Sequence, residues 1–98
     1  MYTGKLKDDL LDQLFGAIML LEDLDECYRF FEDICTVSEL KSLAQRLEVA
    51  KMLQENRTYR EISSRTGAST ATISRVKRSL NYGADGYKLV FDRLSQNS

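Results

Sequence analysis

The segment from Thr58 to Arg78, TYREISSRTGASTATISRVKR, decides the predicted fold of this chain. Gly67 divides the segment in two, and glycine accepts the positive φ that a sharp turn between helices requires. Thr58 and Glu61 have the spacing of a capping box at the start of a first helix, and Ser69 is a suitable N-cap for a second. The segment therefore predicts two short helices joined by a tight turn.

Apolar residues on both sides of this turn are spaced so that they can meet. Ile62 lies on the first predicted helix, Ala68 in the turn, and Ile73 and Val76 on the second helix. A small core of this kind fixes the angle between two helices, and helix-turn-helix units join theirs through a short turn that often contains glycine. The pattern predicts a helix-turn-helix.

The other face of the second predicted helix carries small and basic side chains. Short hydroxyl and methyl groups allow a helix to enter a major groove about 12 Å wide, while arginine and lysine contact guanine or phosphate. We therefore predict DNA contacts from Arg60, Ser69, Thr70, Ala71, Thr72, Ser74, Arg75, Lys77 and Arg78. The alternative is a plain helical hairpin with a solvated basic face.

The charge of the chain is divided unevenly along its 98 residues, although the net charge is only −1. Residues 1–36 contain nine acidic and three basic residues, a net charge of −6. Residues 37–80 contain four acidic and nine basic residues, a net charge of +5. This distribution predicts an acidic end and a basic DNA-reading region. An ordinary solvated surface is the alternative interpretation of the acidic end.

Apolar residues recur at helical spacing along the whole chain, and no segment alternates as a strand does, which predicts an all-α fold of about six helices. One apolar stripe runs from Leu10 to Leu24, and a second helix is expected to start at Asp23 or Asp25. A capping box at Thr36 opens a long helix whose predicted apolar stripe is Leu40, Leu43, Leu47, Ala50 and Leu53. Asn56 is expected to end that helix in the left-handed conformation, and the segment 81–83 to end the recognition helix similarly.

The predicted organisation is one domain over residues 1–98, with a helical dimerisation scaffold (1–57), the helix-turn-helix (58–81) and a covering helix (82–98). The N-terminal helices carry more apolar surface than one small chain can bury, which favours a homodimer. A monomer with a crowded core is the alternative. A two-fold pair would read two half-sites about 34 Å apart.

Several functions are excluded or disfavoured by composition. The chain has no histidine, so no imidazole can activate its serines or bind a metal, and we expect neither catalysis nor a metal site. Cys27 and Cys35 are expected to be two buried thiols acting as small hydrophobes. No apolar run approaches the roughly 20 residues of a membrane span, and no signal peptide is recognisable. We expect a cytoplasmic protein without a membrane partner.

The motifs LxxLxxRLxVAxxL from Leu40 onward, TYREI, TGASTATISR and SLNYG resemble the Trp repressor superfamily, and more closely its Trp-repressor-like members of the YerC/YecD type. The resemblance covers essentially the entire chain and is most specific from Gly67 to Gly83. It implies an intertwined all-helical homodimer whose N-terminal helices wrap around each other. It also implies a transcriptional regulator with a helix-turn-helix at either end of the dimer.

In the tryptophan-responsive members of that superfamily, two arginines sandwich the indole ring of the co-repressor, and they correspond to Arg46 and Arg75. Thr36 and Ser79 match polar positions of the same pocket. The position after the second arginine is glycine in those members and Val76 here, whose branched side chain would fill the space of the ring. We therefore expect no cofactor and consider tryptophan an unlikely effector.

The sequence leaves two classes of function open. The first is a sequence-specific regulator, in particular a repressor that binds a palindromic operator through the major groove. The second is a helical dimeric adaptor of the transcription machinery, whose basic region would dock an acidic protein. The hydroxyl-rich start of the second helix of the helix-turn-helix favours the first, because a protein-docking surface usually has exposed aromatic or aliphatic anchors.

Overall fold

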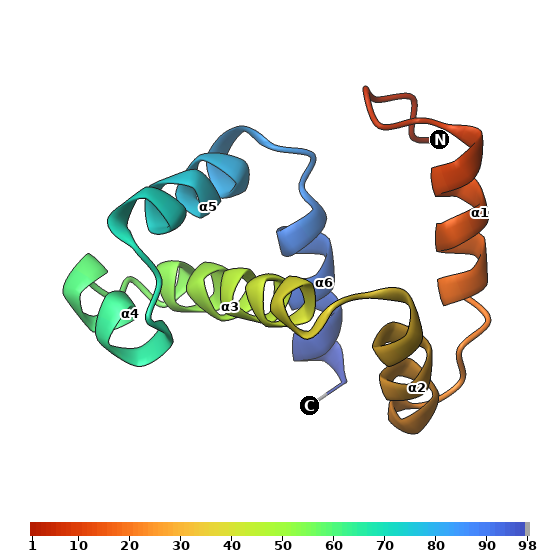
Figure 1. Ribbon diagram of the computed structural model, residues 1–98. Helices are drawn as coiled ribbons and strands as arrows, with labels where there is room; N and C mark the ends of the chain where they lie inside the picture. Colours follow the sequence, from red (N-terminus) through yellow and green to blue (C-terminus); the bar gives the residue numbers. More distant parts are fainter. Residues whose placement is uncertain (98) are drawn as a thin grey trace. The chain divides into compact units, whose positions relative to one another are not determined.

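The structure, a computed structural model, describes residues 1–97 and contains over this range six α-helices and no β-strand. The helices are α1 (Asp9–Ile18), α2 (Leu24–Ile34), α3 (Val37–Gln54), α4 (Tyr59–Thr66), α5 (Thr70–Tyr82) and α6 (Gly86–Gln96), as shown in Figure 1. The predicted all-α fold is therefore confirmed. None of these helices is both long enough and apolar enough to cross a membrane.

The chain divides into two compact units, Met1–Val37 and Ser38–Ser98. The boundary between the units falls near the start of α3, well before residue 57, where the predicted scaffold was expected to end. The assignment of residues 1–57, 58–81 and 82–98 to three functional parts stays a prediction. Ser98, the last residue of the predicted covering segment, lies outside the described residues.

The first unit contains α1 and α2, each started by an aspartate whose carboxylate accepts a hydrogen bond from a backbone N–H of the first turn. These N-caps are Asp8 and Asp23, with distances of 3.1 and 2.9 Å. The single apolar stripe predicted from Leu10 to Leu24 is wrong in extent, because α1 ends at Ile18 and Leu24 already belongs to α2. Asp23 is the N-cap of α2, which agrees with the predicted start of a second helix at Asp23 or Asp25.

Neither helix of the first unit contains a buried residue. Met19 is 84% exposed, and Leu24 and Tyr28 are each 72% exposed. Cys27 and Cys35 are free thiols that are only half-buried, which corrects the prediction that both are buried. The first unit therefore has amphipathic helices but no interior of its own.

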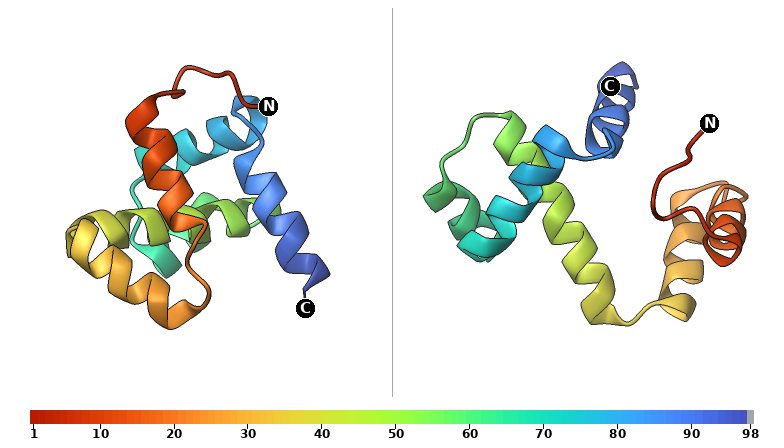
Figure 2. Two further views of the ribbon diagram at one scale, coloured as in Figure 1. Left: turned by 90° about the vertical axis from the view of Figure 1, so that its right-hand side faces the viewer. Right: turned by 90° about the horizontal axis from the view of Figure 1, so that it is seen from above.

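The second unit has a well-defined core at the helix-turn-helix. Its buried residues come from α3, α4, the turn and α5, and they are Val49, Ala50, Met52, Ile62, Ala68, Ile73 and Val76. Tyr87 and Phe91 of α6 pack against this cluster, and their rings are stacked with centroids 6.2 Å apart. The predicted core of Ile62, Ala68, Ile73 and Val76 is confirmed. Figure 2 shows α3 to α6 from two further sides.

The buried face of α3 differs from the predicted stripe. Ala50 is fully buried and Leu53 packs against the core, as predicted, but Leu43 and Leu47 remain exposed. The fully buried Val49 was not part of the predicted stripe. The physical reason is that α4 and α5 cover only the C-terminal part of α3, where the core residues lie. Leu43 and Leu47 therefore keep apolar surface in contact with solvent in the single chain.

The ends of α3 and α5 are built differently. Asn56 has φ 61°, and the N–H of Arg57 donates to the carbonyl of Met52 at 3.0 Å, which is a Schellman end and confirms the left-handed residue expected there. The left-handed end predicted for α5 is wrong, because Gly83 has φ −86° and ψ −154°. Gly83 is nevertheless needed, since a Cβ at this position would collide with the carbonyl oxygen of Ser79.

Candidate nucleic-acid interface

The turn between α4 and α5 is held by a short network of hydrogen bonds. Gly67 has φ 74°, as predicted, and its N–H donates to the carbonyl of Ser63 at 2.8 Å. The Thr66 hydroxyl donates to the carbonyl of Ile62 at 2.7 Å and accepts from the N–H of Ala68 at 3.1 Å. The side-chain amide of Gln45 in α3 donates to the carbonyl of Thr66 at 3.0 Å. Hydrogen bonds therefore stabilise the turn internally and also connect it to α3.

Both helices of the unit begin with the predicted caps. Thr58 Oγ1 accepts from the N–H of Glu61 at 3.1 Å while the Glu61 carboxylate accepts from the N–H of Thr58 at 3.3 Å, so the capping box is complete. Ser69 Oγ accepts from the N–H of Thr72 at 3.1 Å at the start of α5. Each of these bonds satisfies an amide that the helix itself leaves unpaired.

Charge and hydrogen bonding at the start of α4 stabilise an ionised carboxylate. Arg57 Nη1 donates to Glu61 Oε2 at 3.1 Å. This bond, together with those from the backbone N–H and the hydroxyl of Thr58, holds the pKa of Glu61 below its usual value. The carboxylate also lies near the positive end of the α4 dipole, where a negative charge is favourable.

The outward face of α5 is polar, and three of its residues define it. Ala71, Ser74 and Arg78 are spaced at i, i+3 and i+7, so they share one side of the helix, and all three are exposed. The fully buried Ile73 faces the opposite side, against the core. Thr70 and Arg75 are exposed on the same helix, and Arg60 is exposed on α4. The core therefore turns a surface of small and basic side chains outward.

Two of the predicted DNA-contacting residues on α5 point to its flanks. Thr72 is half-buried, and its hydroxyl lies 3.2 Å from Ser69 Oγ. Lys77 is exposed, but its ammonium lies 5.9 Å from the centroid of the Tyr59 ring, at the start of α4. Contact of either residue with DNA stays a prediction.

The residues predicted to line an effector pocket are partly brought together. Arg46, Arg75 and Ser79 line one cavity of about 210 Å³, together with Thr72, Val76 and Tyr87. Thr36 belongs to the first unit and is not among the lining residues. Val76 is both a wall of this cavity and a buried core residue, at 3% exposure. The cavity is smaller than the roughly 300–1,000 Å³ of common ligand sites.

Three residues with a role in this geometry were not identified from the sequence. Gln45 lies on the same face of α3 as the buried Val49 and Met52, at i, i+4 and i+7. A polar residue in line with two apolar residues was the signal that could have identified it. Tyr59 gave no comparable signal, and Tyr87 was recognisable only as an apolar position of the last helix, so neither could be placed on a flank of α5. Their roles depend on packing between distant helices.

These features define an all-helical protein with a helix-turn-helix whose second helix exposes a small, basic surface. The family described as Trp repressor protein matches residues 9–95, and the chain belongs to this family.

Several relatives support the assignment. The chain is 60% identical over 96 residues to the uncharacterized protein YerC of Bacillus subtilis (strain 168), covering 98% of this chain and 92% of YerC. A crystal structure of a TrpR-like protein from Eubacterium eligens is 66% identical, with a TM-score of 0.90 and coverage of 93% of this chain and 94% of the other. The structure of a candidate Trp repressor from Staphylococcus aureus is 56% identical, with a TM-score of 0.88 and coverage of 93% and 91%.

Proposed function

We propose that the protein is a sequence-specific DNA-binding transcriptional regulator whose helix α5 enters the major groove. The observation that carries this proposal is the exposed face of Ala71, Ser74 and Arg78 on a helix whose other side, with Ile73 and Val76, is buried in the core. Membership of the Trp repressor family supports it. Small side chains permit close approach to base edges, and arginine can donate two hydrogen bonds to guanine.

The regulator acts as a homodimer. The first unit buries none of its own helical residues, and Leu43, Leu47 and Leu94 are exposed in the second unit. A second copy would cover this apolar surface. Without a second copy, the chain would expose a larger apolar area than monomeric proteins usually do. Two copies of α5 would then read a palindromic operator with half-sites about 34 Å apart. By occupying a promoter, the dimer represses transcription.

The proposal is tested by selecting bound fragments from genomic DNA at one fixed salt concentration, followed by affinity measurements on the selected site. We expect a palindromic site and an affinity that falls steeply as salt rises, because phosphate contacts release counterions. Recovery of no DNA, together with capture of an acidic protein partner, would instead support the adaptor function.

A matched pair of variants identifies the reading surface. We expect Arg75→Ala and Arg78→Ala each to weaken site-specific binding by about 1–3 kcal/mol, roughly 5-fold to 150-fold, while leaving the dimer intact. Lys51→Ala removes the same charge from an exposed position on α3 and should change the affinity far less. Equal losses in all three variants would show that only net charge matters and would contradict base reading by α5.

Tryptophan is not the effector in this proposal. The side chain of Val76 occupies space beside Arg46 and Arg75, in a cavity of about 210 Å³. Calorimetric titration should therefore show no micromolar tryptophan binding, and operator affinity should be the same with and without tryptophan.

A further inference from the structure

The exposed stripe of α5 extends further than the residues predicted to contact DNA. At about 100° per residue, Arg78 and Tyr82 each lie within about 20° of Ala71 around the helix axis. Tyr82 is the last residue of α5, and its side chain is 85% exposed. It was not among the residues predicted from the sequence to contact DNA. The stripe therefore continues one turn beyond Arg78 and ends on an aromatic residue.

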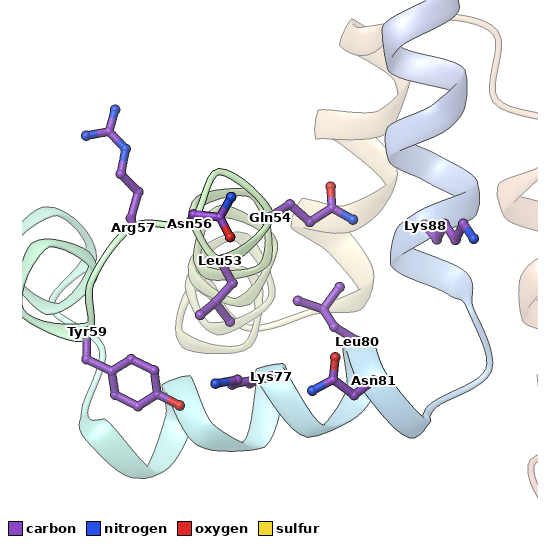
Figure 3. A pocket seen from close by; sticks show the side chains of 9 residues that line it. All are labelled: Leu53, Gln54, Asn56, Arg57, Tyr59, Lys77, Leu80, Asn81 and Lys88. Carbon is purple, nitrogen blue, oxygen red and sulfur yellow. The ribbon is translucent and has the colours of Figure 1, made fainter.

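The opposite side of α5 is engaged with the rest of its unit. Ile73 is fully buried, and Leu80 packs against the core. Figure 3 shows Leu80 directed from α5 towards a cavity of about 590 Å³ beside α3, which Lys77 and Asn81 also line. These contacts determine which side of α5 faces the core. They leave Tyr82 on the outward side, together with the residues expected to read DNA.

The position of Tyr82 along α5 determines which part of a DNA duplex it can meet. Tyr82 follows Ala71 by eleven positions, and a rise of about 1.5 Å per residue separates the two by about 16 Å along the helix axis. The major groove is about 12 Å wide, and the N-terminal residues of a recognition helix contact the base edges. When the start of α5 lies against the bases, its last turn is therefore at the sugar–phosphate backbone that borders the groove.

The chemistry at this end of α5 suits a hydrogen-bond donor on a long side chain. The C-terminal end of a helix carries a partial negative charge, so a phosphate near it needs a donor that extends away from the helix end. A tyrosine hydroxyl is such a donor, and tyrosine is among the side chains that contact phosphate oxygens. α5 itself contains no aspartate or glutamate. The nearest acidic residue in sequence, Asp85, follows Gly83, where the chain has left α5.

We propose that Tyr82 is a further DNA contact, whose hydroxyl donates a hydrogen bond to a backbone phosphate of the operator one turn beyond Arg78. This inference rests on the proposed function, because it assigns another contact to the same face of α5. The tyrosine side chain is neutral, so the contact adds affinity without releasing a counterion and without reading a base. Its role is to fix the position of α5 in the groove.

The inference is tested by measuring the affinity of the full-length protein for the selected site and for an unrelated duplex of equal length, at several salt concentrations. Tyr82→Phe keeps the ring and removes only the hydroxyl. We expect it to weaken binding to both duplexes by at least about fivefold, because each copy of α5 loses a hydrogen bond to a charged group. The slope of log affinity against log salt concentration should stay unchanged, because no positive charge is lost.

Tyr2→Phe is the matched control for the lost hydroxyl. Tyr2 is 50% exposed and belongs to the first unit, outside the helix-turn-helix. The variant should bind both duplexes as the wild type does. Unchanged affinity in Tyr82→Phe, a changed salt slope in that variant, or an equal loss in Tyr2→Phe overturns the inference.

The phosphate partner is located with operators that carry one neutral methylphosphonate in each half-site, placed at successive backbone positions. We expect one position at which the wild type and Tyr82→Phe bind equally, because the partner of the hydroxyl has already lost its charge there. At every other position the difference between the two proteins should persist. A difference that persists at all positions leaves Tyr82 without a phosphate partner and overturns the inference.

The same measurements separate this inference from the proposed function. If the wild type binds no DNA, the proposed function fails and this inference fails with it. If the wild type binds DNA and Tyr82→Phe binds equally well, this inference alone fails.

Tyr82→Leu separates the hydroxyl from the ring, and it should lose as much DNA affinity as Tyr82→Phe. Sedimentation equilibrium should show an unchanged homodimer in both variants. If only Tyr82→Leu loses DNA affinity, or if it weakens the homodimer or the binding of a captured acidic protein, the ring is a packing or docking anchor and the inference is overturned.

Discussion

The two units of this chain differ in how much of their apolar surface they bury. The second unit gathers Val49, Ile62 and Ile73 into an interior that excludes solvent completely. The first unit, with helices of similar length, buries no helical residue and leaves Leu24 and Tyr28 largely exposed. The difference teaches that the helix-turn-helix is stabilised within one chain, whereas the apolar surface of the N-terminal helices would be covered only in the proposed homodimer.

The largest effect is expected when the first unit is made polar, which tests whether its exposed apolar residues form the proposed interface. Leu10→Glu combined with Leu24→Glu places charge on two exposed apolar positions, one on each N-terminal helix. Each leucine buried in a dimer contributes roughly 1.5–3 kcal/mol, and each change occurs twice per dimer. We expect the dimer dissociation constant to rise by at least about a thousandfold in sedimentation equilibrium.

The control for this variant is Gln13→Glu, which adds a charge to an exposed polar position of α1. It should leave the dimer intact. If the Leu10→Glu, Leu24→Glu variant stays dimeric at the concentrations at which the wild type is dimeric, the exposed apolar residues of the first unit are not an interface.

The next prediction concerns the interior of the second unit. Ile73→Ala removes a fully buried side chain and should cost about 2–5 kcal/mol of unfolding free energy, measured by urea denaturation. Because Ile73 packs against its own chain, the same cost is expected in the Leu10→Glu, Leu24→Glu background. A cost that disappears in that background would mean that the core also depends on dimerisation.

A smaller effect is expected at the turn. Gly67 has φ 74°, and a Cβ there would meet no neighbouring atom, so the cost of Gly67→Ala is backbone strain alone. We expect a loss of about 1–2 kcal/mol in thermal or urea unfolding. Gly67→Asn should lose less, because asparagine tolerates the left-handed conformation. Equal losses for alanine and asparagine would point to a cause other than φ.

The sequence was sufficient to predict those parts of the fold that depend on local chemistry. The caps at Thr58 and Ser69, the left-handed Gly67 and the core around Ile73 follow from spacing and residue type, and all are present. The predicted stripe of α3 was wrong at Leu43 and Leu47, because periodicity places apolar residues on a face without showing what covers that face.

Parts of the candidate site depend on contacts that spacing cannot reveal. Gln45 reaches the carbonyl of Thr66 across 21 positions in sequence, and Lys77 approaches the ring of Tyr59 from another helix. Both contacts need the angle between helices, which only the packed core sets. The exposed face of α5 was predictable because it is local. Arg46, Arg75 and Ser79 of the cavity on one flank were predicted only through the family resemblance, and the cavity on the other flank, which Tyr59 and Lys77 line, was not predicted.

The smallest expected effect concerns the electrostatics of the capping box, which belongs to the unit that is stable within one chain. The pKa of Glu61 is lowered by Arg57 and by the backbone and hydroxyl of Thr58. A depressed pKa in the folded state contributes stability above the unfolded-state pKa, and this contribution is lost as pH falls through the folded value. We therefore expect Glu61→Gln to be less stable than wild type at neutral pH and to lose less stability on acidification.

Thr58→Ala removes the hydroxyl cap and should lower the free energy of unfolding by about 1 kcal/mol. A carbon-detected NMR titration of this variant should show the Glu61 pKa moving back towards its usual value. If the pKa of Glu61 is unchanged in Thr58→Ala and in Arg57→Gln, the hydrogen bonds at the start of α4 are not what lowers it.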